Sequence, residues 1–103
     1  MSVVLIYTVF ETPGEAADVA RSVVTERLAA CANILSGCQS IYEWDGIVRE
    51  TIETPVIFKT TSKLRDTLMD RLIDLHAYHV PAIVAIEGTA SAAFEGWIMQ
   101  QVS

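Results

Sequence analysis

The dipeptide Asp45-Gly46 divides one long strand-forming stretch of the chain into two arms. Asp-Gly is typical of the tight turn of a β-hairpin, because both residues tolerate positive φ angles. The outgoing arm covers residues 31–43, and the return arm, residues 47–60, alternates between apolar and polar side chains. Each arm has roughly a dozen residues or more, whereas a strand usually has about five or six. Arms of this length extend beyond a small domain, and pairing with a second copy of the chain is the economical way to cover them.

Two residues within the arms depart from the strand pattern. Gly37 predicts a bulge in the outgoing arm. Pro55 has no N–H to donate to a ladder, so we expect the return arm to be interrupted there or to lie at a sheet edge.

The spacing of apolar residues predicts a strand and a helix before the hairpin. Residues 3–9 form a continuous apolar run, which is typical of a central strand covered on both faces. Thr12 can accept from the amide of Glu15, and apolar residues then recur at helical spacing as far as Ala30. We therefore predict one amphipathic helix that lies on a sheet.

Three further elements are predicted after the hairpin: a helix from Ser62 to about Leu75, a short buried strand over residues 83–86, and a helix that starts at Thr89 or Ser91. The order is βαββαβ with an additional C-terminal helix, which is the ferredoxin-like arrangement. The predicted fold class is α+β: a ferredoxin-like sandwich with a long β-hairpin. We expect residues 1–103 to form a single domain, because this length is typical of one domain.

The composition favours an oligomer and argues against nucleic acid as a partner. Hydrophobic residues make up 51% of the chain and charged residues 19%. A chain this short can bury little by itself, so the surplus apolar surface is expected between subunits. The formal net charge of −6 would repel a phosphate backbone.

The cysteines and the N-terminal residues lead us to expect a cytoplasmic protein with no membrane partner. Cys31 and Cys38 are too few for the disulfide framework of a secreted protein. The first apolar run has no basic region before it. It is too brief for a signal peptide and far too brief for a membrane span.

Three residues are candidate metal ligands: His76, His79 and Cys31. Neutral imidazole binds copper, zinc or nickel, and two histidines three residues apart could share one ion if the backbone turns suitably. Alternatively, His76 stabilises a helix C-terminus by its charge and His79 lies on the surface. A thiolate at Cys31 would be a soft ligand, whereas a buried Cys31 would act as a small hydrophobe.

Four further residues are candidates for ligand binding or for a subunit interface: Lys59, Trp44, Tyr78 and Glu53. Lys59 interrupts an apolar strand end, where it could neutralise a carboxylate or hold an anionic ligand. Glu53 is expected to be a surface charge or part of an ion pair between subunits. Trp44 and Tyr78 could line a pocket at a subunit junction, although such residues are more often interface anchors.

The chain carries none of the common catalytic motifs. The patterns GxGxxG, GxSxG and HExxH and the phosphate-binding P-loop are all missing from the sequence. We therefore expect a protein that is not an enzyme and that has no organic cofactor.

Several segments resemble the CutA divalent-ion tolerance family. They follow in order along nearly the whole chain, and a tryptophan in the last predicted helix accompanies them: ERLAACANI at 26–34, SIYEWDG at 40–46, FKTTS at 58–62 and HAYHVPAIVAI at 76–86. Each segment alone is a weak signal, but together they are specific.

The resemblance implies a ferredoxin-like subunit in a tight trimer whose long hairpins pair between neighbours. It also implies a role in divalent-cation tolerance, with copper the usual candidate ligand and no established catalytic reaction. The trimer of the family is similar in architecture to the PII signalling proteins, although a shared fold does not transfer function. The leading hypothesis is a homotrimer that weakly binds a divalent cation. The alternative is a PII-like regulatory or scaffold trimer that binds a protein partner or a small anion.

This chain departs from the family in the segment that contains both histidines. The family usually reads HPYEVPE where residues 76–82 read HAYHVPA. Some copper-binding members carry a cysteine in the first strand and adjacent histidines before the tyrosine. The matching positions here are Tyr7 and Leu75, so His76 is the one matching histidine.

Overall fold

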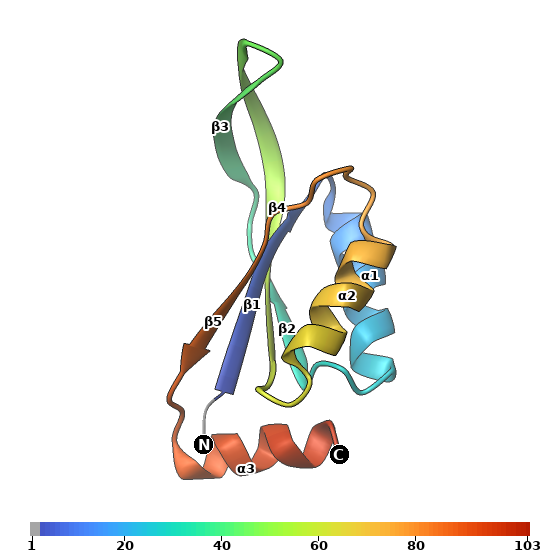
Figure 1. The fold of residues 1–103 in the computed structure, drawn as a ribbon, viewed down its shortest axis with the longest axis vertical. Coiled ribbons are helices and arrows are strands. Elements are labelled where there is room, and N and C mark those ends of the chain that lie inside the picture. Colours follow the sequence, from blue (N-terminus) through green and yellow to red (C-terminus); the bar gives the residue numbers. More distant parts are fainter. Residues whose placement is uncertain (1–2) are drawn as a thin grey trace.

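The structure of the chain, a computed structural model, describes residues 3–103. Its elements follow in the order β1 (Val3–Phe10), α1 (Pro13–Thr25), β2 (Cys31–Ile34), β3 (Cys38–Trp44), β4 (Ile47–Thr61), α2 (Arg65–Leu75), β5 (Ile83–Gly88) and α3 (Ala92–Gln101). The sheet has the strand order β2-β4-β1-β5, with β3 also paired to β4, and every pair is antiparallel (Figure 1). This arrangement confirms the predicted ferredoxin-like α+β fold with a long hairpin and a C-terminal helix.

The main core lies between the sheet and the helices α1 and α2, which cover the same face of it (Figure 1). Alternate residues of β1 point into this core, among them Val4 and Ile6, and Phe58 of β4 lies beside them. From the helices, Val23 and Leu68 are fully buried in the same cluster. The predicted central strand and amphipathic helix therefore build most of the hydrophobic interior.

On the opposite face of the sheet, Val9 and Glu53 are buried near the hairpin, where Tyr78 contacts Glu53. A second covered area of this face is at its base. There α3 lies across the end of the sheet (Figure 1), and its Ile98 packs with Val3 and Ala30 in a second, smaller cluster. Farther along this face, Tyr7 of β1 and Val84 and Ile86 of β5 are exposed. Within residues 3–103, no helix has the length and apolar character needed to cross a membrane.

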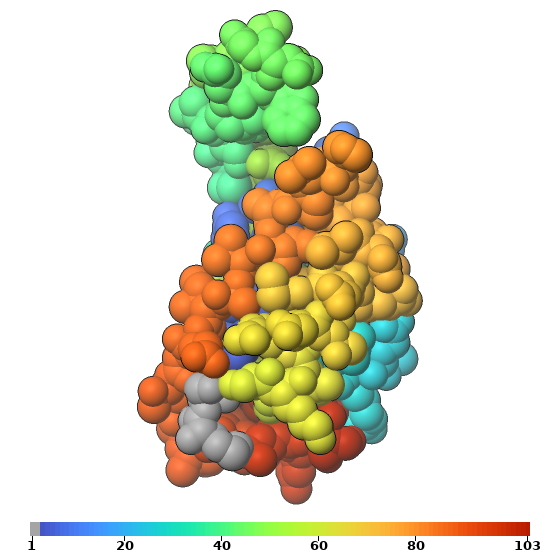
Figure 2. All heavy atoms as spheres, in the orientation of Figure 1, coloured from blue at the N-terminus to red at the C-terminus, as the bar shows by residue number. Residues whose placement is uncertain are grey.

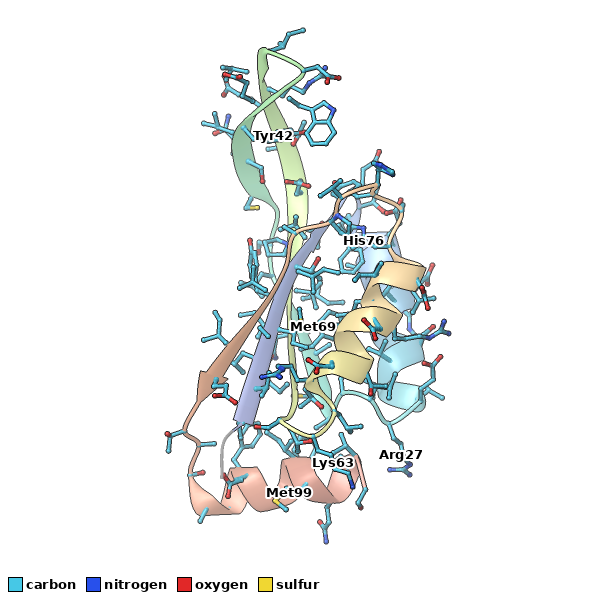
Figure 3. All side chains as sticks on the ribbon, viewed as in Figure 1. Arg27, Tyr42, Lys63, Met69, His76 and Met99 are labelled. Carbon is cyan, nitrogen blue, oxygen red and sulfur yellow. The ribbon has the colours of Figure 1, made fainter. Side chains whose placement is uncertain are left out.

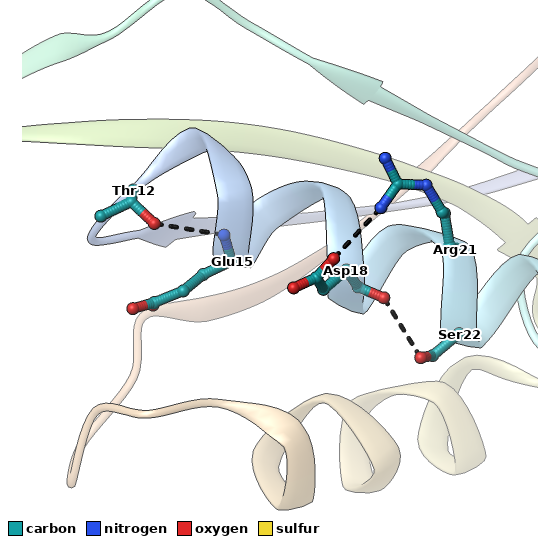
Figure 4. Close-up of polar contacts among 5 residues, drawn as sticks. All are labelled: Thr12, Glu15, Asp18, Arg21 and Ser22. Atoms are coloured by element: carbon teal, nitrogen blue, oxygen red, sulfur yellow. Dashed lines mark hydrogen bonds and ion pairs between the residues drawn. The ribbon is translucent and has the colours of Figure 1, made fainter.

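The first helix begins as predicted but ends earlier. Thr12 Oγ1 accepts from the Glu15 amide at 3.1 Å, and the polar face of the helix carries an Asp18–Arg21 ion pair (Figure 4). The predicted end at Ala30 is wrong, because α1 stops at Thr25 and Arg27 takes a φ angle of 62°. The chain turns out of the helix there so that Ala30 N can donate to Lys59 O at the edge of the sheet, at 2.8 Å.

The second helix begins later than predicted. Leu64 N donates to Thr61 O in a turn, and α2 starts at Arg65 without a side-chain cap. The hydroxyl of Ser62 does not cap this helix and instead donates to Glu87 Oε1, at 3.4 Å.

The hairpin turn is at the predicted position, whereas the outgoing arm is divided. Asp45 and Gly46 have φ angles of 53° and 76°, as the turn requires. The outgoing arm is divided between β2 and β3, and in the intervening segment residues 35–37 face only residues 54–55 of β4. The one extra residue makes this segment a bulge, as predicted from Gly37. A Cβ atom at Gly37 would lie 3.1 Å from Ile52 Cγ2, so this close approach favours glycine.

The predicted interruption at Pro55 is wrong. β4 is continuous over 15 residues, and Pro55 is paired with Val9 inside the sheet. Its carbonyl accepts from Leu35 N, so its missing N–H would point to the segment that joins β2 and β3. No ladder bond is lost there, because β4 exchanges one partner strand for the next at this position.

The hairpin projects well beyond the rest of the molecule. Figure 2 shows residues near the turn as a separate projection above the body. No residue of β3 is buried, and the part of β4 before Glu53 is exposed throughout. Two apolar residues on one side of this projection, Ile41 and Val48, are about two-thirds exposed.

Candidate functional site

A cleft of about 800 Å³ lies where the hairpin meets the body. One wall comes from β3 and β4, and the other comes from the end of β1 and the segment that follows α2; Figure 3 labels Tyr42 on the hairpin and His76 at the end of α2. The charged and aromatic lining residues, with His79, are Tyr7, Glu11, Tyr42, Trp44, Asp45, Arg49, Glu53 and Tyr78. The strand register explains the hairpin wall, because alternate residues of β4 from Arg49 to Glu53 share one face.

Glu53 is a buried carboxylate with an incomplete set of partners. Its side chain is 9% exposed, and the Tyr78 hydroxyl donates to its Oε2 at 2.7 Å. The ion pairs among residues 3–103 lie elsewhere, so no basic side chain balances the charge of Glu53. A buried carboxylate is costly without a paired charge and further hydrogen bonds.

The tyrosines beside Glu53 are held in their neutral form. Burial, and then the hydrogen bond to Glu53, raise the pKa of Tyr78 well above the ordinary value for a phenol. The pKa of Tyr7 is also raised, first by burial and then by the negative charges of Cys38 and Glu53. Both hydroxyls therefore remain hydrogen-bond donors at neutral pH.

His76 is committed to the structure through both ring nitrogens. Its Nε2 lies 2.7 Å from Val9 O, and the Tyr78 amide donates to its Nδ1 at 3.1 Å. These partners define a neutral ring with its proton on Nε2. The ring also stacks on Phe10 at a centroid distance of 4.6 Å. His76 thus joins the end of β1 to the segment after α2, and it has no free lone pair for a metal ion.

The three predicted metal ligands do not converge. His79 is exposed and lines the cleft, whereas Cys31 is opposite Lys59 in the β2–β4 ladder, outside the cleft. Within the described part of the chain, no three His, Cys, Asp or Glu side chains are close enough to hold one metal ion. The donor set of one subunit therefore does not fit a closed metal site, which needs about four ligands.

Three of the four predicted ligand or interface residues come together, and one does not. Glu53, Trp44 and Tyr78 all line the cleft. Lys59 lies farther along β4, where its Nζ is 5.5 Å from the ring centroid of Phe94 in α3. The positive charge of Lys59 therefore lies over an aromatic ring outside the cleft.

The comparison with known proteins assigns the family. Residues 4–101 match the family described as CutA1 divalent ion tolerance protein. The chain belongs to the CutA1 family. One relative is the divalent-cation tolerance protein CutA of Thermus thermophilus, which is 46% identical over 71 residues, or 69% of each chain. Another is the chloroplastic protein CutA of Arabidopsis thaliana, with 34% identity over 86% of this chain and 49% of that protein. This CutA1-family chain therefore spans about half the length of the Arabidopsis relative.

Solved CutA structures have the same fold as this family member. The CutA of Xylella fastidiosa superposes with a TM-score of 0.95 at 30% identity and covers 100% of both chains. CutA1 of Ehrlichia chaffeensis gives a TM-score of 0.95 at 29% identity and covers 98% of this chain and 95% of that one. The Archaeoglobus fulgidus structure is described as a periplasmic divalent cation tolerance protein, so names within the CutA1 family point to more than one compartment.

Sequence reasoning missed several residues of the cleft in this CutA1-family chain. Tyr7 was matched only to a family position, and Glu11 and Arg49 were not singled out as cleft residues. The available signals were the odd-numbered positions of β1 and β4, which share the sheet face away from α1 and α2. Placing Glu11 also required the path of residues 76–82, which the sequence alone does not give.

Proposed function

We propose that this chain acts in divalent-cation tolerance as a homotrimer whose hairpin cleft takes a cation. The observation that carries this proposal is the buried Glu53 carboxylate, which has Tyr78 as a hydrogen-bond donor and no basic partner among residues 3–103. A cation that enters the cleft supplies the missing charge. Asp45 and Glu11 add negative charge to the lining, against one arginine, Arg49.

Two exposed apolar surfaces support the trimer. One is the uncovered sheet face with Val84 and Ile86, and the other is the outer side of the hairpin with Ile41 and Val48. Contiguous apolar surface of this kind is typical of protein interfaces. Light scattering after size exclusion tests the assembly, with an expected mass of three times the 11.3 kDa chain. A stable mass of one chain would contradict the proposal.

We propose that His79 is the metal ligand, that it binds the ion weakly, and that copper is the first candidate. Both ring nitrogens of His76 are occupied, whereas His79 is exposed at the cleft. One imidazole without two nearby protein ligands makes an incomplete site. Calorimetric titration with copper and zinc should give weak saturable binding that His79→Ala removes. No saturable binding by the assembled protein would overturn the metal proposal.

A second candidate function is a PII-like regulatory or scaffold trimer. The exposed Ile41 and Val48 favour a protein partner for the hairpin, while the negative lining of the cleft disfavours a small anion there. The two candidates differ in what the cleft takes. Electron density for an anionic species near Lys59, in a crystal of the assembly, would favour the second.

We further propose that the protein is not an enzyme and is cytoplasmic. A screen for turnover at several pH values tests the first statement, and fractionation of the producing cells tests the second. Confirmed turnover that depends on Glu53 would replace the binding role with a catalytic one.

A further inference from the structure

The cleft combines a buried negative charge with several aromatic side chains. Glu53 is at its inner end, where the Tyr78 hydroxyl occupies one carboxylate oxygen at 2.7 Å. Among residues 3–103, Tyr78 is the one hydrogen-bond donor to this carboxylate. The other oxygen is available to a donor that enters from the cleft. Tyr7, Tyr42 and Trp44 line the same space.

We propose that this cleft binds the primary ammonium group of a small organic cation, with the ammonium at Glu53 and the carbon chain directed along the hairpin wall toward Tyr42 and Trp44. The inference rests on the proposed role of the cleft as a cation site and specifies the chemical class of the cation. An ammonium group brings three N–H donors, of which one can satisfy the free oxygen of Glu53 and restore charge balance.

The lining favours an organic cation over a bare metal ion. A divalent ion requires several oxygen, nitrogen or sulfur ligands around it. The described residues offer no such group of three. Aromatic rings cannot replace these ligands, but their faces attract an organic cation and pack against its carbon atoms. A cleft of about 800 Å³ is also within the size range of small-molecule sites.

The polarity along the cleft gives the ligand a direction. Arg49 and Glu53 lie on the same face of β4, four residues apart, which is about 13 Å along a strand. The positive end of a ligand belongs at Glu53, because like charge at Arg49 would repel it. His79 and Val80 also line the cleft and are exposed to solvent.

The test is a titration of the full chain with n-octylammonium, whose carbon chain is long enough to extend from Glu53 toward the hairpin rings, followed through the indole N–H resonances of the two tryptophans. Trp44 lines the cleft, whereas Trp97 lies on α3 outside it and serves as an internal control. We expect a saturable shift of the Trp44 signal and no shift of the Trp97 signal. n-Octanol, which has the same length and no charge, should produce no saturable shift.

Matched variants separate the buried charge from the overall charge. Glu53→Gln keeps the shape and removes the charge, and it should weaken binding about tenfold or more through loss of one charge-assisted hydrogen bond. Glu50→Gln removes the same charge on the opposite face of the strand, where Glu50 accepts from Gln39 in solvent, and should leave binding unchanged. If Glu53→Gln does not fold, Tyr42→Leu tests the aromatic wall and should weaken binding several-fold.

Several outcomes would overturn the proposal. They are no saturable shift of Trp44, an equal response to n-octanol, or equal affinity in Glu53→Gln and the unaltered chain. Loss of the trimer mass in Glu53→Gln, without ammonium binding in the parent, would also overturn the proposal and would assign the charge of Glu53 to assembly. Copper and zinc titration of the same samples reports separately on the proposed function. Metal binding without ammonium binding rejects this inference alone, and failure of both rejects the cation cleft.

Discussion

The body of the molecule and the hairpin arm are built from the same sheet but are stabilised differently. In the body, β4 runs between β1 and β2, and its Val56 and Phe58 are fully buried under helices. In the arm, the same strand pairs only with β3, and Ile41 on that partner is 65% exposed. The body therefore gains from apolar burial, whereas the arm is held by a two-stranded ladder that is marginal alone in water.

This difference in burial indicates which residues of the chain are available for binding. The boundary between the two regions falls at Glu53, the first buried residue of β4 after the turn. Residues on the arm side of this boundary contribute little to the folding of the subunit, so they are free to serve as a binding wall or an interface. Mutations in each region should therefore change different measurements.

The largest effect on folding is expected from Phe58→Ala in the body. Phe58 has no exposed surface, so its truncation leaves a cavity and should lower the free energy of unfolding by about 3–5 kcal/mol. Chemical denaturation measures the change. A loss no greater than that of an exposed position would mean that the body does not carry the stability.

The next effect is expected from His76→Ala in protein that has been treated with a chelator. The substitution leaves Val9 O and the Tyr78 amide without their partner and removes the stack on Phe10. We expect a loss of about 2–3 kcal/mol in the free energy of unfolding. His79→Ala, at the exposed histidine, is the control and should change stability little. A loss that appears only with metal present would instead make His76 a ligand.

A smaller effect is expected from Tyr78→Phe, at the boundary of the two regions. Loss of its hydrogen bond to Glu53 should cost about 1–2 kcal/mol at neutral pH. Because the pKa of Tyr78 is raised in the folded state, its contribution is complete below the unfolded pKa of about 10 and is lost as the pH rises through the folded value. The stability difference between the two proteins should therefore narrow in strong alkali. Denaturation at several pH values measures it, and a difference that widens with pH would contradict the sign.

The smallest effect on the subunit itself is expected from Ile41→Ala in the arm. An exposed side chain contributes little to folding, so the change should stay within about 0.5 kcal/mol at high dilution. If a sister chain covers the arm, the variant should instead weaken assembly, and its denaturation midpoint should depend more strongly on protein concentration. A midpoint independent of concentration in both proteins would mean that the arm is not covered.

The sequence predicted the fold better than the site. The Asp45-Gly46 turn, the Thr12 cap and the strand periodicity are local signals, and the structure confirms each of them. The end of α1 was missed because the main chain of Arg27 leaves the helix to reach the sheet, which depends on tertiary contacts. The predicted interruption at Pro55 was wrong for the same reason. A proline is tolerated there because the pairing of β4 changes from β2 to β3 at this position, which the sequence does not reveal.

The candidate site was predicted by residue type but not by grouping. Trp44, Tyr78 and Glu53 were singled out separately, and the cleft that unites them requires the hairpin to stand against the segment after α2. His76 looked like a free imidazole because the sequence cannot reveal that Val9 O and the Tyr78 amide occupy its two nitrogens. Tyr78 is only two residues from His76, but Val9 is 67 residues away and becomes its neighbour only when α2 packs against the sheet.

Because β4 is one continuous strand, the packing of its residues in the core also determines which side chains of the hairpin arm face the cleft. Val9 and Phe10 face Pro55 and Thr54 in the β1–β4 ladder, and that alignment decides which side chains look outward. A register slip of one residue would move every side chain of β4 to the other face of the sheet. Thr54 would then face solvent, and the Glu53 carboxylate would face the helices. Packing of Phe58 in the interior therefore also fixes the orientation of Arg49 and Glu53 toward the cleft, several residues away along the same strand.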